Sequence, residues 1–371
     1  MRTHSPGYDK QLQISALAGK LKVPLGRLLE RAHITANDIV LIAGTLIEGI
    51  GTPCSDFDVY IIKEARIRPD ELPPNCSHRY MTNNGEVVVT YETLPETNIG
   101  VDIEYKTTSE LKNAIKDVSQ LYNYLRQRAK FSGTKGDHEQ LIYRAFHAIP
   151  VQNADAFRSL IGNLKAHEVC FNAYRRSAFS YPYFRDIVGC WRQGDFETSF
   201  LMARKWGLDN ARAFTHLNGN VNTGDKYLLR YVARLPTRDD DIKSIVQRLA
   251  TAGATTAKQL REYVLDWCDA VDMIAARSLS IRNTTRGFPS TDDQLALTRL
   301  EVSASLRWHT ELSREFAYRN REFLRGLPPL REFLDEIPGP ALARYLADDE
   351  VPTWVKVKTG RPLEEALNWR D

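Results

Sequence analysis

Two aspartates separated by one residue form the clearest chemical motif in the chain. Asp56 and Asp58 flank Phe57 at the start of a predicted strand, where successive side chains point to opposite faces. Both carboxylates therefore share one face, while Phe57 points into the core. Two carboxylates at this spacing can jointly bind a hard divalent cation such as Mg²⁺. Phosphoryl transfer uses such cations to neutralise developing charge and to align the attacking and leaving oxygens.

A glycine and a threonine precede these aspartates at the end of a predicted buried strand. The strand is the compact apolar run at residues 39–43, and Gly44 ends it. A glycine lets backbone N–H groups approach a phosphate without an intervening Cβ. A helix starting after Gly44 would add its positive end, and Thr45 can donate its hydroxyl to a phosphate oxygen. This segment is therefore a candidate phosphate-binding turn.

Residues 44–58 resemble the signature of the polymerase-β-like nucleotidyltransferase superfamily. That signature is a strand, Gly-Ser or Gly-Thr, a short helix, and a second strand carrying Asp-x-Asp among hydrophobic residues. Here Thr45 replaces the more usual serine and keeps the hydroxyl, and Ser55 before the first aspartate is common in such loops. The resemblance covers mainly residues 38–106. It implies that Gly44, Thr45 and Ser55 contact a nucleotide.

The resemblance also requires a third carboxylate on a neighbouring strand. After a predicted hairpin at residues 78–94, the predicted strand 101–105 carries Asp102 and Glu104 on one face. We prefer Asp102, because its shorter side chain holds a metal-bridging geometry more tightly, and we keep Glu104 as the alternative. The family implies that this carboxylate and the two earlier aspartates bind two Mg²⁺ ions, or Mn²⁺. The third carboxylate can also take the proton of the attacking hydroxyl.

The predicted elements divide the chain into three parts and give an α+β fold class. Residues 1–34 are predicted to form an N-terminal helical arm. Residues 35–133 are predicted to form a small mixed-sheet nucleotidyltransferase domain with flanking helices, one of which runs from Thr108 to about Arg128. Residues 134–371 have an almost entirely helical pattern. We expect them to form a large helical domain that binds the acceptor.

The helical part contains three further candidate segments. Lys226, near the start of a predicted helix, is similar to helical-domain lysines that reach the triphosphate in several nucleotidyltransferases. The alternative is a solvated lysine in a first turn capped by Asn222 or Thr223. The aromatic and arginine-rich residues 171–192 could hold a base or an anionic acceptor, but such aromatics more often form a core. The acidic run at 238–241 is better interpreted as helix-start charge.

The bulk composition indicates a globular protein and excludes several classes. The 371 residues are 43% hydrophobic and 26% charged, which allows a sizeable core. The net charge of +3 permits an anionic substrate, whereas a dedicated nucleic-acid binder usually has a stronger excess, so nucleic acid is not indicated. The five cysteines lack metal or redox spacing and are interpreted as free thiols. With no signal peptide and no membrane span apparent, we expect a cytoplasmic location.

These patterns together predict a reaction. A nucleoside monophosphate would pass from a nucleoside triphosphate, for which we expect ATP, to a hydroxyl of a small-molecule acceptor, with release of pyrophosphate. One alternative keeps this chemistry with a nucleotide, tRNA or protein as the acceptor, including synthesis of a nucleotide second messenger. Another is a catalytically inactive regulatory module that binds nucleotide. The acceptor and the oligomeric state are left open.

Overall fold

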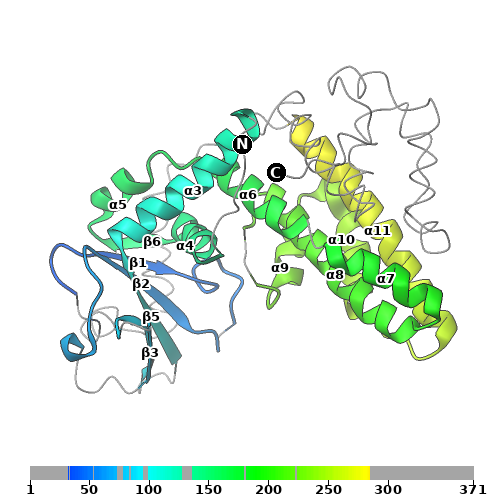
Figure 1. Ribbon diagram of the computed structural model, residues 1–371, viewed down its shortest axis with the longest axis horizontal. Helices are drawn as coiled ribbons and strands as arrows, with labels where there is room; N and C mark the ends of the chain where they lie inside the picture. The colour runs from blue at the N-terminus through cyan, green and yellow to red at the C-terminus, as the bar shows by residue number, and fades with distance from the viewer. Residues whose placement is uncertain are drawn as a thin grey trace, which may run out of the picture. The chain divides into compact units, whose positions relative to one another are not determined.

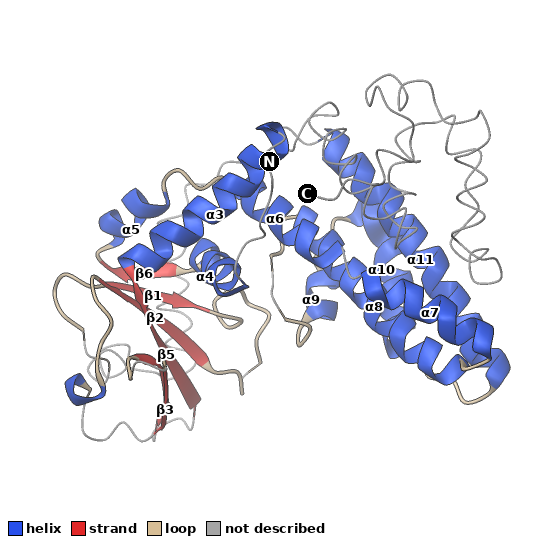
Figure 2. Ribbon diagram, in the orientation of Figure 1, coloured by secondary structure: helices blue, strands red, loops and turns tan. Residues whose placement is uncertain are grey.

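The computed structural model of the chain describes residues 32, 34–52, 54–72, 78–82, 85–94, 99–127, 136–178, 181–221 and 224–284. Contacts divide the chain into two compact units, which are residues 1–120 with 132–169, and residues 121–131 with 170–371. Strands and helices form the first unit, whereas the described part of the second is helical (Figures 1 and 2). The predicted arm lies almost entirely outside the described residues, as does the predicted helical domain beyond Thr284.

The first unit is built on a six-stranded mixed sheet, which confirms the α+β class. The strands are β1 (Ile39–Ala43), β2 (Phe57–Lys63), β3 (His78–Met81), β4 (Val87–Leu94), β5 (Ile99–Thr107) and β6 (Ile149–Gln152). Their order across the sheet is β3-β4-β5-β2-β1-β6. β2 and β5 run parallel, and the other neighbouring pairs are antiparallel. The strands predicted from the apolar runs and the hairpin are all present.

One face of this sheet is apolar because β2 and β5 alternate in the same phase. The residues of this face are fully or almost fully buried and belong to one core cluster, which includes Val40, Ile42, Phe57, Val59, Ile61, Val101, Ile103 and Tyr105. Most of the intervening positions of β2 and β5 carry polar side chains, among them Asp58 and Asp102. The alternation that buries the core therefore also directs both carboxylates to the opposite face.

Three helices accompany the sheet in the first unit. α3 (Thr108–Gln127) follows β5, and a capping box starts it. Glu110 N donates to Thr107 Oγ1 at 3.1 Å, while Thr107 N donates to Glu110 Oε2 at 2.7 Å. α4 (Gly136–His147) packs on β1, and α5 (Ala154–Ile161) packs on β1 and β6. Figure 1 shows the three helices gathered at the β1–β6 side of the sheet, and a short 3₁₀ turn, η1 (Pro69–Glu71), lies elsewhere in the unit.

The sheet extends past the predicted domain boundary at residue 133. β6 pairs with β1 as the edge strand, so residues 132–169 belong to the first unit. The Gln152 side-chain amide donates to Thr35 O and Asp38 O at 2.8 and 2.9 Å, which anchors the strand at the base of β1. This strand was not predicted from the sequence, because it is short and its Pro150 was interpreted as a break between helices. A proline is tolerated in a strand at the edge of a sheet.

The second unit is a helical assembly around α8 and α11. Its helices are α6 (Ala166–Ala178), which begins in the first unit, α7 (Tyr181–Gln193), α8 (Phe196–Leu217), α9 (Leu228–Ala233), α10 (Asp240–Thr251) and α11 (Ala257–Thr284), with a 3₁₀ turn η2 (Thr237–Asp239). α8 approaches α11 closely at Gly207, where an added Cβ would lie 2.0 Å from the Trp267 ring. Trp267 is fully buried, so this contact is at the centre of the unit's core.

Two expectations for the helical part are confirmed. Phe171, Tyr174 and Trp191 are each at least 95% buried in the core cluster, as the core interpretation of this aromatic segment predicted. The acidic run belongs to a helix start, since Asp240 and Asp241 occupy the first turn of α10.

None of the helices among the described residues has the length and apolar character needed to span a membrane.

Candidate functional site

The strand register brings the predicted carboxylates together. Asp58 on β2 is the direct partner of Asp102 on the parallel strand β5, so the two side chains stand next to one another on the same face. Asp56 lies just before β2 and faces the beginning of β5, because an added Cβ on Gly100 would lie 2.5 Å from Asp56 Oδ1. The three carboxylates therefore occupy one end of the β2–β5 pair.

Glu104, the alternative third carboxylate, has other partners. Tyr60 Oη, on a side chain that is 2% exposed, donates a 2.6 Å hydrogen bond to Glu104 Oε1. Lys106 Nζ lies 3.0 Å from Glu104 Oε2. The strand register pairs Glu104 with Tyr60 and leaves Asp102 beside Asp58. The geometry therefore favours Asp102 over Glu104 for a role shared with Asp58.

Gly44 meets Asp58 so closely that no side chain fits between them. Its φ of +88° lies in the region that favours glycine, and an added Cβ would stand 1.6 Å from Asp58 Oδ2. A single turn follows, with Glu48 N donating to Gly44 O at 3.1 Å and Ile50 N donating to Thr45 O at 3.0 Å. The helix predicted after Gly44 is thus only one turn long, because the chain leaves it through Gly49 at φ +68°.

Ser55 lies inside the loop that leads to the aspartates. It is 3% exposed, and its Oγ accepts a 2.8 Å hydrogen bond from Thr52 N, while Ser55 N donates to Thr52 O at 2.9 Å. The hydroxyl therefore braces the loop that carries Asp56. The contact of Ser55 with a nucleotide stays a prediction, and these hydrogen bonds give the residue a second role in the shape of the loop.

Arg144 is a member of the site that the sequence reasoning missed. It projects from α4, and its Nη1 lies 4.0 Å from Asp58 Oδ2. Its Nε is buried and has no hydrogen-bond partner. No local pattern identifies this residue, because it lies far along the chain from Asp58, in a segment that was predicted to belong to the helical domain. The packing of α4 on β1 brings it to the carboxylates.

Burial and mutual repulsion raise the proton affinity of the carboxylates. The pKa of Asp58 is raised to about 6, first because the group is buried and then because Asp102, Glu104 and Asp56 are nearby, while Arg144 opposes the shift. The pKa of Asp102 is also raised, mainly by burial and then by Asp56 and Glu104. Carboxylates that are crowded in this way are stabilised when a cation neutralises their charge.

The oxygen atoms of the three aspartates suit a hard divalent cation, although the carboxylates do not converge on a single point. Among the described residues, no three His, Cys, Asp or Glu side chains are already grouped as a metal site. Three carboxylates nevertheless supply the oxygen ligands that Mg²⁺ prefers, and the glycines at 44 and 100 leave no side chain between the carboxylates and the backbone. A cation that binds Asp58 must compete with Arg144 for the same carboxylate.

The chain is similar in structure to a solved protein, although its sequence matches no family model. No protein-family model matches the chain, and no curated protein matches it. Among solved structures, a nucleotidyltransferase-like protein from Exiguobacterium sibiricum 255-15 is similar at 11% identity with a TM-score of 0.35. The match covers 80% of this chain and 89% of that one.

Lys226 belongs to the second unit and lies before a helix rather than inside one. It precedes α9, whose N-cap is Tyr227, and its side chain is exposed with Nζ 5.4 Å from the centre of the Tyr227 ring. It lines a pocket of about 310 Å³ together with Arg204, Tyr227 and Arg230. The capping residues expected at 222 and 223 lie outside the described residues.

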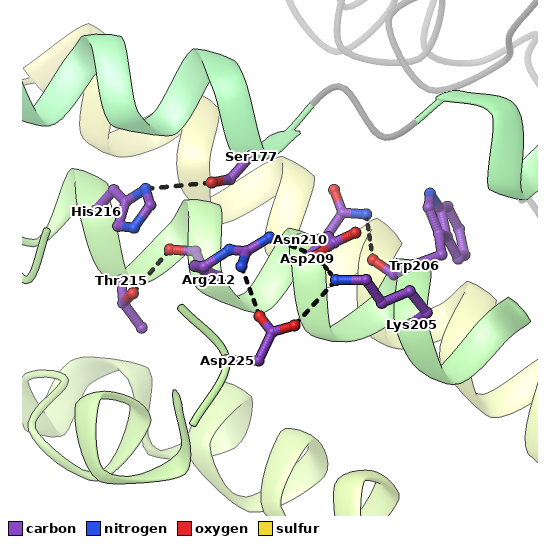
Figure 3. Close-up of polar contacts among 9 residues, drawn as sticks. All are labelled: Ser177, Lys205, Trp206, Asp209, Asn210, Arg212, Thr215, His216 and Asp225. Carbon is purple, nitrogen blue, oxygen red and sulfur yellow. Dashed lines mark hydrogen bonds and ion pairs between the residues drawn. The ribbon is translucent and has the colours of Figure 1, made fainter. Parts of the chain in front are cut away.

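The turn that carries Lys226 is tied to α8 through its neighbour Asp225 (Figure 3). Asp225 accepts from Lys205 Nζ at 3.0 Å and from Arg212 Nη1 at 2.6 Å. The same two cations reach Asp209, at 2.7 and 2.5 Å. Two cations and two carboxylates therefore balance one another in this network, and Asp225 lines the same pocket as Lys226.

Proposed function

We propose that this protein is a metal-dependent nucleotidyltransferase that moves a nucleoside monophosphate from a nucleoside triphosphate to a hydroxyl acceptor and releases pyrophosphate. One observation carries the proposal. Asp58 and Asp102 are register partners on parallel strands, with Asp56 at the same end and the Gly44-Thr45 turn against Asp58. A cluster of carboxylates beside a glycine turn suits a substrate that brings both phosphate and divalent metal.

Each residue then has a defined part in the reaction. Asp56, Asp58 and Asp102 would hold two Mg²⁺ ions, which supply charge neutralisation and alignment of the reacting oxygens when bound. Gly44 lets the carboxylate of Asp58 lie directly against the turn, and Thr45 on that turn donates its hydroxyl to a phosphate oxygen. Asp102, which stands beside Asp58 on the neighbouring strand, also accepts the proton of the acceptor hydroxyl. We expect ATP as the nucleotide and a small molecule as the acceptor.

The first experiment measures magnesium-dependent pyrophosphate release with each of the four nucleoside triphosphates, and compares wild type, Asp102→Asn and Glu104→Gln. Assays with a panel of hydroxyl acceptors, including nucleotides, tRNA and protein, are read by mass spectrometry. Because Asp102 lies beside Asp58 while Glu104 is bound to Tyr60 and Lys106, Asp102→Asn should lower release by about 100-fold or more, as loss of a general base does. Glu104→Gln should retain most of the activity.

The outcomes separate the candidate functions. Release that depends on Asp102 supports catalysis, and the mass of the product identifies the acceptor class. Loss in Glu104→Gln with activity kept in Asp102→Asn would show that the third carboxylate is Glu104. Nucleotide that binds without any release across the whole panel would overturn the enzyme proposal and support an inactive regulatory module.

Lys226 provides a separate prediction for the second unit. We propose that it contacts the nucleotide phosphates, because it is an exposed cation on the rim of a pocket with two arginines. Lys226→Ala should raise the KM for the nucleotide about tenfold, the loss expected for one charge-assisted hydrogen bond. Lys258→Ala is the matched control, since this lysine is exposed on α11 in the same unit. Equal KM values in wild type and both variants would exclude Lys226 from the nucleotide site.

A further inference from the structure

Arg144 interacts electrostatically with the carboxylate cluster and with the turn after Gly44. Its guanidinium pairs with Asp58, and the carboxylate of Asp58 lies directly against Gly44. Glu48, on the turn that follows Gly44, is among the groups that stabilise the charge of Arg144. One cation therefore faces both the proposed metal ligands and the proposed phosphate-binding turn.

The contact between Arg144 and Asp58 is long for a partly buried ion pair. The separation of 4.0 Å is longer than the 2.7–2.9 Å of a charge-assisted hydrogen bond. The side chains are 24% and 17% exposed, and Arg144 Nε has no partner although it is buried. A partly buried guanidinium with an unused donor is stabilised by an additional anion. The geometry therefore leaves Arg144 able to exchange its partner.

We propose that Arg144 is an exchangeable counter-ion, which pairs with Asp58 in the metal-free protein and passes to a phosphate of the nucleotide when divalent metal occupies Asp58. The inference rests on the proposed function for the identity of the anion. Arg144 would lose its partner if Asp58 held a cation, and a phosphate of the nucleotide would then take the place of the carboxylate. The planar guanidinium suits phosphate oxygens, with which it forms paired hydrogen bonds.

An exchange of partners by Arg144 predicts changes in affinity that a purely structural role of this residue does not. Arg144 competes with metal at Asp58 but assists the metal-bound nucleotide, so its removal changes the two affinities in opposite directions. Arg144 also stays with Asp58 in the absence of metal, so it contributes little to the binding of free nucleotide. A residue that only stabilises α4 would lower both affinities and the melting temperature together.

The test measures Mn²⁺ binding without nucleotide by electron paramagnetic resonance, and binding of a non-hydrolysable ATP analogue by calorimetry, with Mg²⁺ and with EDTA. The proteins are wild type, Arg144→Gln, Arg144→Lys and Arg158→Ala, the last a control at an exposed arginine on α5. In Arg144→Gln, Mn²⁺ should bind about tenfold more tightly, because a competing cation is gone. The same variant should bind the Mg²⁺ complex of the analogue about 10- to 100-fold more weakly, and the analogue in EDTA as wild type does.

The two Arg144 variants distinguish an exchange of partners from a structural role of Arg144. Arg144→Lys retains the charge and should keep Mn²⁺ affinity near wild type while recovering part of the analogue affinity. Unchanged Mn²⁺ affinity in Arg144→Gln, or parallel losses of both affinities in the two Arg144 variants, would overturn the exchange. A wild-type protein that binds Mn²⁺ but not the analogue would contradict the proposed function and the phosphate step with it. The competition at Asp58 would then be judged by the Mn²⁺ result alone.

Discussion

Asp58→Asn is expected to stop nucleotide transfer and, at the same time, to stabilise the folded protein at neutral pH. Activity should fall at least about 1,000-fold, because the variant removes the charge of a proposed metal ligand. Stability should rise because Asp58 is a largely buried carboxylate, 17% exposed, among three other acids. Asparagine keeps the shape of the side chain and removes the charge that burial penalises.

The pH dependence follows from the pKa of Asp58, which is raised from 3.8 to about 6 on folding. Below the lower value the group is protonated in both the folded and unfolded states, so it costs nothing. Between the two values the unfolded chain releases the proton more readily, so the folded state loses stability as pH rises, and the loss is complete above the higher value. At 1.36 kcal/mol per pKa unit the full effect is about 3 kcal/mol.

The measurement is urea unfolding of wild type and Asp58→Asn in EDTA, from acidic to neutral pH. The variant should be the more stable protein at neutral pH, and the difference should vanish near pH 4. Added Mg²⁺ should stabilise wild type but not the variant, since the proposed metal site exists only in the folded protein and includes Asp58. Asp155→Asn, which changes an aspartate that is 96% exposed in the same unit, should shift stability by less than about 0.5 kcal/mol. A variant as stable as wild type at neutral pH would mean that Arg144 fully offsets the burial of Asp58.

Gly207→Ala is expected to destabilise the second unit strongly. An added Cβ would lie 2.0 Å from one carbon of the Trp267 ring and 2.4 Å from two others. Trp267 is fully buried between α8 and α11, so the ring cannot move without disturbing the core. Overpacking of this kind costs about 3 kcal/mol, which exceeds the roughly 1 kcal/mol that alanine gains over glycine in a helix.

Gly189→Ala is the matched control, because Gly189 is an exposed glycine inside α7 of the same unit and has no atom within 4 Å of an added Cβ. This variant should be unchanged or up to about 1 kcal/mol more stable. Unfolding followed by circular dichroism gives the free energies, and hydrogen exchange along α8 and α11 locates the change. Similar behaviour of the two glycine variants would show that α8 and α11 are not packed as closely at Gly207 as the structure has them.

The sequence by itself determined the elements around the site. The apolar run at residues 39–43 and the alternation in β2 and β5 are local patterns, and each fixes which side chains share a face. The strands and α3 could therefore be predicted, and so could the common face of Asp56 and Asp58. The glycine at position 44 was also identifiable, although its contact with Asp58 was not.

Only the tertiary structure decided how these elements meet. The register of β2 against β5 depends on hydrogen bonds between distant segments, and it places Asp102 beside Asp58 and Glu104 beside Tyr60. β6 joins the sheet through pairing with β1, which no local pattern of residues 149–152 indicated. The packing of α4 then carries Arg144 to Asp58. Local periodicity sets the direction of a side chain, whereas its neighbours depend on long-range pairing and packing, and for this reason the counter-ion of the carboxylates was absent from the sequence prediction.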